Sequence, residues 1–157
     1  MDHGILMADS PEHQDDRNGS DSLRRGVLVL HDVRSELDSI QTKVVAGIRD
    51  AGYDEASTFA VRLALEEAVA NAFRHGNDED PRKAVKVEFD ISGDRIWLAV
   101  EDEGPGFDPT AVPDPTEEAN LEIPSGRGLL LMREYMTRVE FVPPGNRVRM
   151  HYVRDAE

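Results

Sequence analysis

The sequence predicts a two-layer α/β sandwich, with three helices on one face of a mixed, mostly antiparallel sheet. Three observations lead to this fold class. Two segments of the first half place apolar residues every three or four positions, as amphipathic helices do. Segments of the second half alternate apolar and polar residues, as half-buried strands do. The resulting order is β-α-α-β-β-loop-α-β-β, without internal repeats.

The first half of the folded part is predicted to hold one strand and two helices. The strand is expected within residues 23–31, which contain the apolar run VLVL. The first helix is expected from Val33 to Gly52, with Asp32 as its N-cap. Its apolar face is formed by Val33, Leu37, Ile40, Val44 and Ile48. The second helix is expected over residues 54–75.

The second half is predicted to hold four strands, a long loop and a short helix. Alternation predicts the strands over residues 85–91, 96–100, 138–142 and 147–153. Residues 103–126 are too rich in glycine and proline for regular structure, and long loops of this kind are usually functional or mobile. The short helix is expected over residues 127–136.

The composition fits one domain and excludes several functions. The chain has 157 residues, no cysteine and a net charge of −14, which argues against nucleic-acid or membrane binding, cysteine-ligated zinc and thiol chemistry. Residues 1–22 hold six acids and one arginine and lack aromatic residues, so we expect a disordered acidic tail before a domain of residues 23–157. No apolar run suits a signal peptide or a membrane span, which predicts a soluble, cytoplasmic protein.

The second helix carries two separate polar stripes. Its core stripe is Val61, Leu65, Ala68 and Ala72. Arg62 and Glu66 form a stripe that suits solvent, and Glu67, Asn71 and His75 form another, roughly opposite. Because a surface helix needs only one polar stripe, Glu67 and Asn71 are expected to face a polar cavity. The alternative is that both are solvated on an exposed helix.

Glu67 and Asn71 suit phosphoryl transfer. A carboxylate accepts the proton of an attacking hydroxyl group, and an amide oxygen ligates Mg²⁺ without adding charge. The common nucleotide signatures are nevertheless absent from the sequence, namely the P-loop, the Rossmann glycine motif and the protein-kinase HRD and DFG loops.

Two further segments hold candidate binding residues. Asp102 directly follows a strand, and Gly104 and Gly106 beside it allow backbone to approach a ligand closely. The alternative is a simple turn rich in Asp, Gly and Pro. The segment Ser125-Gly126-Arg127-Gly128-Leu129 opens a helix whose bare N–H groups favour an anion. Each signal is weak by itself.

In this order, the three segments resemble the N, G1 and G2 boxes of the GHKL ATPase superfamily. The matching stretches are EEAVANAFRHGN, DEGPGF and GRGLLLM. The resemblance covers about residues 23–153, and the compact size and the β-α-α order look most like the anti-sigma factor serine/threonine kinases, which have the histidine-kinase-like Bergerat fold. It implies ATP and Mg²⁺ as cofactors.

The resemblance also implies a role for each matching residue. Glu67 would be the general base, Asn71 the Mg²⁺ ligand, and Asp102 the acceptor for the adenine amino group. Gly104 and Gly106 would border the adenine pocket. The nucleotide-binding residues of the third box would be Gly126, Arg127, Gly128 and Leu129, with Gly126 and Gly128 at the phosphates. Residues 108–125 would form the ATP lid.

One departure concerns the phosphate site. The kinases that the chain resembles carry an arginine immediately before the Ser-Gly of the third box, and this position is Pro124 here. An arginine supplied in trans to other NTPases contributes roughly 10³–10⁵ in rate, so its loss would be costly. Arg127 is the alternative cation.

Several functions therefore follow as hypotheses. The first is a serine/threonine kinase that phosphorylates a small STAS-type anti-sigma antagonist and sequesters a sigma factor, with a homodimer compatible with the resemblance. The second is a non-catalytic, ATP-dependent binding switch, favoured by Pro124, whereas Glu67 and Asn71 favour the kinase. The third is the ATP-binding domain of a split histidine kinase, although the sequence holds no phosphoacceptor helix hairpin. A nucleotide-free structural domain would require the three boxes to coincide by chance.

Overall fold

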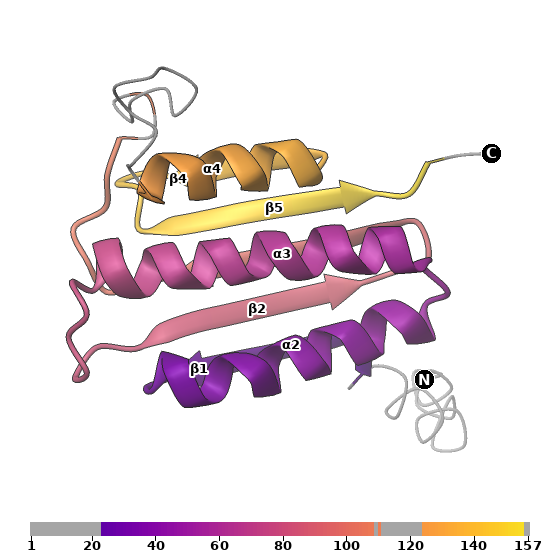
Figure 1. Ribbon diagram of the computed structural model, residues 1–157, viewed down its shortest axis with the longest axis horizontal. Helices are drawn as coiled ribbons and strands as arrows, with labels where there is room; N and C mark the ends of the chain where they lie inside the picture. The colour runs from indigo at the N-terminus through magenta and orange to yellow at the C-terminus, as the bar shows by residue number, and fades with distance from the viewer. Residues whose placement is uncertain (1–22, 109, 111–123, 156–157) are drawn as a thin grey trace, which may run out of the picture.

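The structure is a computed structural model that describes residues 23–108, 110 and 124–155 (Figure 1). The expected acidic tail and nearly all of the expected lid lie outside the described residues. The elements are β1 (Arg25–Leu30), α2 (Val33–Asp50), α3 (Glu55–Asn71), the π-helix η2 (Ala72–Gly76), β2 (Val85–Ile91), β3 (Arg95–Glu101), α4 (Pro124–Tyr135), β4 (Arg138–Val142) and β5 (Arg147–Val153).

The predicted two-layer sandwich is confirmed. The five strands form one sheet in the order β1-β2-β3-β5-β4, and α2, α3 and α4 lie on one of its faces (Figure 1). The sheet is more regular than expected, because all four strand pairings are antiparallel. β5 lies between β3 and β4, so the last hairpin brings the turn between β4 and β5 next to the loop that follows β3.

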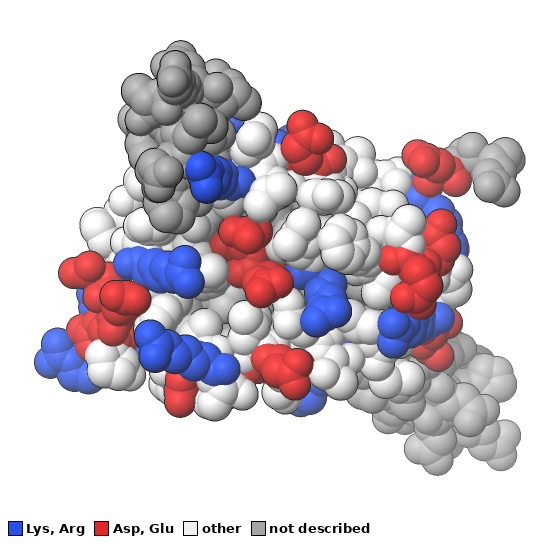
Figure 2. All heavy atoms as spheres, viewed as in Figure 1, with Lys and Arg blue, Asp and Glu red and all other residues white. Residues whose placement is uncertain are grey.

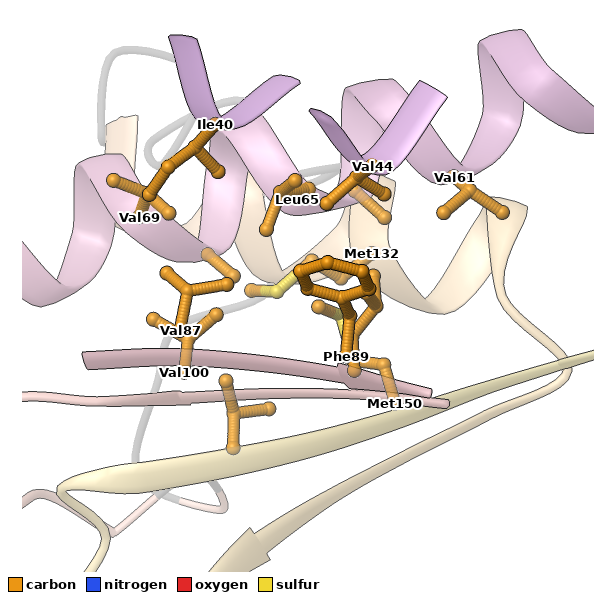
Figure 3. Close-up of a cluster of buried hydrophobic side chains, with 14 of the residues drawn as sticks. Ile40, Val44, Val61, Leu65, Val69, Val87, Phe89, Val100, Met132 and Met150 are labelled. Atoms are coloured by element: carbon orange, nitrogen blue, oxygen red, sulfur yellow. The ribbon is translucent and has the colours of Figure 1, made fainter. Parts of the chain in front are cut away.

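The core lies between the helices and the sheet. Alternate residues of the strands point toward the helix layer and are buried, whereas their neighbours face away from it. Figure 3 shows side chains of the three helices meeting those of the strands; the labelled residues are Ile40, Val44, Val61, Leu65, Val69, Val87, Phe89, Val100, Met132 and Met150. Burial of one such side chain contributes about 1.5–3 kcal/mol.

The helix ends differ in detail from the sequence predictions. α2 begins after Asp32 as predicted, but the Asp32 side chain makes no cap hydrogen bond. The Glu36 carboxylate instead accepts the N–H groups of His31 and Asp32 at 2.7 and 2.8 Å. α4 begins at Pro124 rather than at Arg127, because proline is tolerated in the first turn of a helix, where its missing N–H costs nothing.

The second helix also ends differently. It changes at Ala72 into a π-helix, which is closed by a hydrogen bond from Asn77 N–H to the Ala72 carbonyl at 2.8 Å. A π-turn holds one more residue than an α-turn and therefore rotates the residues that follow. This change of pitch decides where His75 and Gly76 lie relative to the end of the sheet.

The helix-covered surface mixes charges of both signs. Figure 2, drawn from the same side as Figure 1, shows acidic and basic side chains interspersed over the helices. None of the helices in the described part of the chain is long and apolar enough to span a membrane.

Candidate functional site

A cavity of about 250 Å³ lies where the end of α3, the π-helix, α4 and the strands β3 and β5 meet. Its polar side chains are Asn71, His75, Asp102 and Asn146. Its apolar wall includes Val100, Leu129, Met132 and Val148. This volume is close to the lower end of the roughly 300–1,000 Å³ range of small-molecule sites.

Asp102 is held in place at its backbone and at its carboxylate. Its N–H donates to the Asn146 carbonyl at 2.9 Å, and its own carbonyl accepts from Asn146 Nδ2 at 3.1 Å. One carboxylate oxygen, Oδ1, accepts the Gly104 N–H at 2.7 Å. The other, Oδ2, has no hydrogen-bond partner among the described residues, so it is left to accept from a ligand.

The surroundings of Asp102 make ionisation of its carboxyl group less favourable than it is in water. Burial raises the pKa of Asp102 above its usual value, and the negative charge of Glu101 raises it further. The Gly104 N–H and the Lys83 ammonium lower the pKa but do not cancel these effects. A carboxyl group in this position gains most from a ligand that donates a hydrogen bond to it.

Three glycines allow the chain segments near Asp102 to pack closely against one another. A Cβ atom on Gly76 would overlap the Asp102 carboxylate, and one on Gly104 would overlap the Gly76 carbonyl. Gly106 has a φ of +85°, and a Cβ there would overlap the Pro144 carbonyl. The sequence suggested that Gly104 and Gly106 admit a ligand to the backbone. In the structure, their missing side chains let chain segments pack against each other, and of these two only Gly106 lines the cavity.

Glu67 and Asn71 lie beneath the beginning of α4. A Cβ atom on Gly128 would lie 3.0 Å from both Glu67 Oε2 and Asn71 Nδ2, so glycine lets α4 approach these side chains. Asn71 lines the cavity, and Glu67 lies beside it on the side of α4. Burial raises the pKa of Glu67, the neighbouring Glu66 raises it further, and Arg74 lowers it.

The structure thus brings most of the predicted site residues together. Leu129 is buried and contributes to the apolar wall, whereas the Arg127 side chain is exposed and does not line the cavity. Gly126 lies in the first turn of α4, and its surroundings are outside the described side chains. In the described part of the chain, no group of three or more His, Asp or Glu side chains is placed to hold a metal ion.

Some residues of the site were not identified from the sequence. Phe107 and Phe141 stack edge to face beside the cavity, with ring centroids 4.9 Å apart and planes at 74°. Asn146 belongs to the Pro-Pro-Gly-Asn segment, whose sequence indicates only a turn. Phe107 had a signal, since it ends the DEGPGF stretch, but Phe141 and Asn146 come close to it only through the strand order.

Comparisons with known proteins agree with this geometry. The family model described as "Histidine kinase-like ATPase domain" matches residues 30–152. An anti-sigma F factor of Clostridium perfringens (strain SM101 / Type A) is 34% identical over 90 residues, which cover 55% of this chain and 64% of that protein. Anti-sigma F factors of Geobacillus thermodenitrificans and Geobacillus stearothermophilus are 31% and 29% identical, over 74% and 85% of this chain and 82% and 94% of theirs.

The extent of these matches differs. The clostridial relatives are covered over 64% and 59% of their own length, which is less than two thirds, whereas the Geobacillus proteins are covered almost entirely or over four fifths. The family model covers most of the chain, including α3, β3 and α4, which build the cavity. The chain therefore belongs to the histidine kinase-like ATPase domain family, and its relatives there include anti-sigma F factors.

Proposed function

We propose that this protein is an anti-sigma regulatory factor that binds Mg²⁺-ATP in the cavity and reads the adenine base with Asp102. One observation carries the proposal: a fixed carboxylate in an apolar cavity keeps one oxygen, Oδ2, without a hydrogen-bond partner among the described residues. The adenine amino group is a donor that suits this oxygen. The names of the Geobacillus and clostridial relatives support a sigma factor as partner.

The donor set of the cavity fits a nucleotide. Val100, Met132 and Val148 offer an apolar wall to a base. Asn71 presents an amide next to Glu67, and an amide oxygen is a suitable Mg²⁺ ligand at a site that already carries a carboxylate. Bound ATP would supply the phosphoryl group and its Mg²⁺ would neutralise the phosphate charge.

We further propose that the protein transfers phosphate to a serine or threonine of a small STAS-type antagonist. Glu67 is the residue for proton transfer, because burial raises its pKa toward the range in which a carboxylate is an effective base. The attacking hydroxyl oxygen forms its bond to phosphorus, the bond to the ADP oxygen breaks, and the hydroxyl proton passes to Glu67.

A second candidate function is a binding switch that responds to ATP without transferring phosphate. No lysine or arginine side chain of the described residues lines the cavity, and the Arg127 side chain is exposed outside it. Phosphoryl transfer depends strongly on cations at the phosphates. Pro124, at the start of α4, stands where the resembled kinases carry such a cation.

One experiment separates these functions. The purified chain is incubated with radiolabelled Mg²⁺-ATP and with candidate STAS-type antagonists and sigma factors from the same organism. The kinase predicts label on a serine or threonine of the antagonist. The switch predicts no label but a change of sigma-factor affinity on ATP addition, and Pro124→Arg would then test whether a cation restores transfer. Absence of ATP binding in calorimetry would refute both.

A further inference from the structure

Asn77 is a buried polar residue that connects three segments. It follows the π-helix, and its side chain has no solvent exposure (0%). Its Nδ2 donates to the Ala84 carbonyl, just before β2, at 2.9 Å. Its Oδ1 accepts the N–H of Glu103, just after β3, at 2.7 Å. Both polar groups of the amide are therefore used, and both bind backbone that comes from outside the helix.

A further hydrogen bond closes this connection. The Ala84 N–H donates to the Glu103 carboxylate, so residues 84 and 103 are joined directly as well as through Asn77. The end of the helix, the start of β2 and the end of β3 consequently form one unit. The loop after β3 cannot shift relative to the helix without breaking at least one of these bonds.

The peptide group between Asp102 and Glu103 is held from both edges. Its N–H, that of Glu103, donates to Asn77 Oδ1 at 2.7 Å. Its carbonyl, that of Asp102, accepts from Asn146 Nδ2 at 3.1 Å. Two asparagine side chains therefore fix the orientation of this peptide plane. Since the plane follows Asp102 directly, its orientation determines the backbone geometry from which the Asp102 side chain projects.

We infer that Asn77, acting with Asn146, is a positioning residue that fixes the Asp102 carboxylate and so sets selectivity for adenine over guanine. The inference rests on the proposed function, in which Asp102 accepts from the amino group of the base. Guanine presents a carbonyl oxygen at the corresponding edge, and an acceptor facing a carboxylate leaves both without a donor. A carboxylate that can turn away tolerates guanine, whereas a fixed one rejects it.

The experiment measures base selectivity and stability in the full chain. The variants are Asn77→Leu, which has similar volume but no hydrogen-bonding groups, and Asn146→Ala. Calorimetry gives the dissociation constants for Mg²⁺-ATP and Mg²⁺-GTP, and thermal unfolding gives the midpoint. We expect each variant to lower the ratio of ATP affinity to GTP affinity at least about tenfold, equivalent to about 1.4 kcal/mol.

A matched control separates positioning from general destabilisation. Thr58 is also buried, at 3% exposure, and its Oγ1 donates to the Asp54 carbonyl at 2.8 Å in the first turn of α3. Thr58→Val should lower the unfolding midpoint and leave the ATP-to-GTP ratio unchanged. A residue with a purely structural role at position 77 would behave like this control.

The ratios measured for the variants decide whether Asn77 and Asn146 position Asp102. The inference is overturned if folded Asn77→Leu keeps the wild-type ratio of ATP to GTP affinity. Should that variant not fold, it is overturned if Asn146→Ala keeps the ratio; we expect this variant to fold, because Asn146 is only half-buried. Asp102→Asn serves as reference. If Asp102→Asn itself keeps the ratio, the proposed role of Asp102 fails and the positioning role with it. If Asp102→Asn lowers the ratio of ATP to GTP affinity while Asn77→Leu and Asn146→Ala keep the wild-type ratio, only the positioning role fails.

Discussion

The carboxylates in and beside the cavity, Asp102 and Glu67, lie in a different environment from those on the open face of the sheet. On the sheet, Arg147 Nη1 donates to Glu88 at 3.1 Å and to Glu101 at 3.3 Å, which links β5, β3 and β2. Glu140 accepts from Arg149 at 2.6 Å. None of the ion pairs in the described part of the chain includes Glu67 or Asp102.

The pKa values follow this difference. Hydrogen bonding and charge from Arg149 lower the pKa of Glu140. Burial alone would raise the pKa of Glu88, but Arg147 and Lys86 outweigh it and the net pKa is lowered. Burial raises the pKa values of Glu67 and Asp102, because the smaller opposing effects of Arg74 on Glu67 and of Lys83 on Asp102 do not cancel it.

The contrast supports the proposal that the acids on the sheet stabilise the fold and that Glu67 and Asp102 act on a ligand. Ionised, paired acids on the sheet contribute stability, whereas a partly buried acid that forms no ion pair costs stability until a ligand supplies a partner. Raised pKa values of this kind concentrate at functional sites. The following predictions test the difference between these two sets of carboxylates.

The largest effect is expected for Glu67→Gln. The amide keeps the shape of the side chain but cannot take a proton, so phosphate transfer should fall by roughly 10²–10⁴-fold. ATP affinity should change little, since Glu67 lies beside the cavity rather than in its wall. Transfer is measured as labelled antagonist per unit time, and affinity by calorimetry.

Glu66→Gln is the matched control for this prediction. Glu66 is adjacent in sequence but exposed on the opposite stripe of α3. Equal losses of transfer in the two variants would assign the effect to the charge of the helix rather than to a base at position 67.

A smaller effect is expected on the sheet, from Arg147→Ala. The substitution leaves Glu88 and Glu101 without their shared cation and should destabilise the fold at neutral pH by about 1 kcal/mol, the upper end for partly exposed ion pairs. The lowered pKa of Glu88 means that its contribution is present above its unfolded pKa, about 4.3, and is lost as the pH falls through its folded pKa.

Urea unfolding at several pH values checks this prediction. The stability difference between wild type and Arg147→Ala should be largest at neutral pH and shrink below about pH 4. ATP affinity should be unchanged. A difference that stays constant with pH would mean that packing of the arginine stem, rather than its charge, is responsible.

The smallest effect is expected for Arg74→Gln. Arg74 lowers the pKa of Glu67, so its removal should raise that pKa further. Carbon-detected NMR titration of the Glu67 carboxyl group should show a higher midpoint than in wild type. Arg62→Gln, on the solvent stripe, should leave the midpoint unchanged, and a shift of equal size there would argue for a general charge effect.

Much of the fold could be predicted, because the spacing of apolar residues within single segments indicates the helices and strands. Val85, Val87, Phe89 and Ile91 alternate with polar residues, and their burial in β2 follows from that alternation alone. The stripe of Glu67 and Asn71 was likewise identified from its spacing on α3. Both features depend on residues within one element.

The remaining features arise from contacts between elements. Asn146 reaches Asp102, and Phe141 reaches Phe107, because β5 lies between β3 and β4, which no local pattern specifies. The π-helix that begins at Ala72 leads directly to Asn77, whose side chain accepts a hydrogen bond from the loop after β3. Tertiary contacts therefore determined the finer geometry of the site.

The central claim is that Asp102 is a half-buried acid, costly to the fold, that recognises adenine. Thermal unfolding of wild type and Asp102→Asn, with and without Mg²⁺-ATP, tests it most directly. The amide oxygen can still accept the Gly104 N–H, while the desolvated charge is removed. An amide NH₂ facing the base amine costs about 1–3 kcal/mol of binding.

Asp102→Asn should raise the stability of the nucleotide-free protein and reduce its stabilisation by ATP. Because the folded pKa of Asp102 is raised, the carboxyl group favours the fold at low pH, and this contribution is lost as the pH rises through the folded pKa. Asp102→Asn should therefore unfold at a higher temperature than wild type at neutral pH without nucleotide, yet lose most of the stabilisation by ATP. A variant that is less stable without nucleotide and is stabilised by ATP as strongly as wild type would contradict the account.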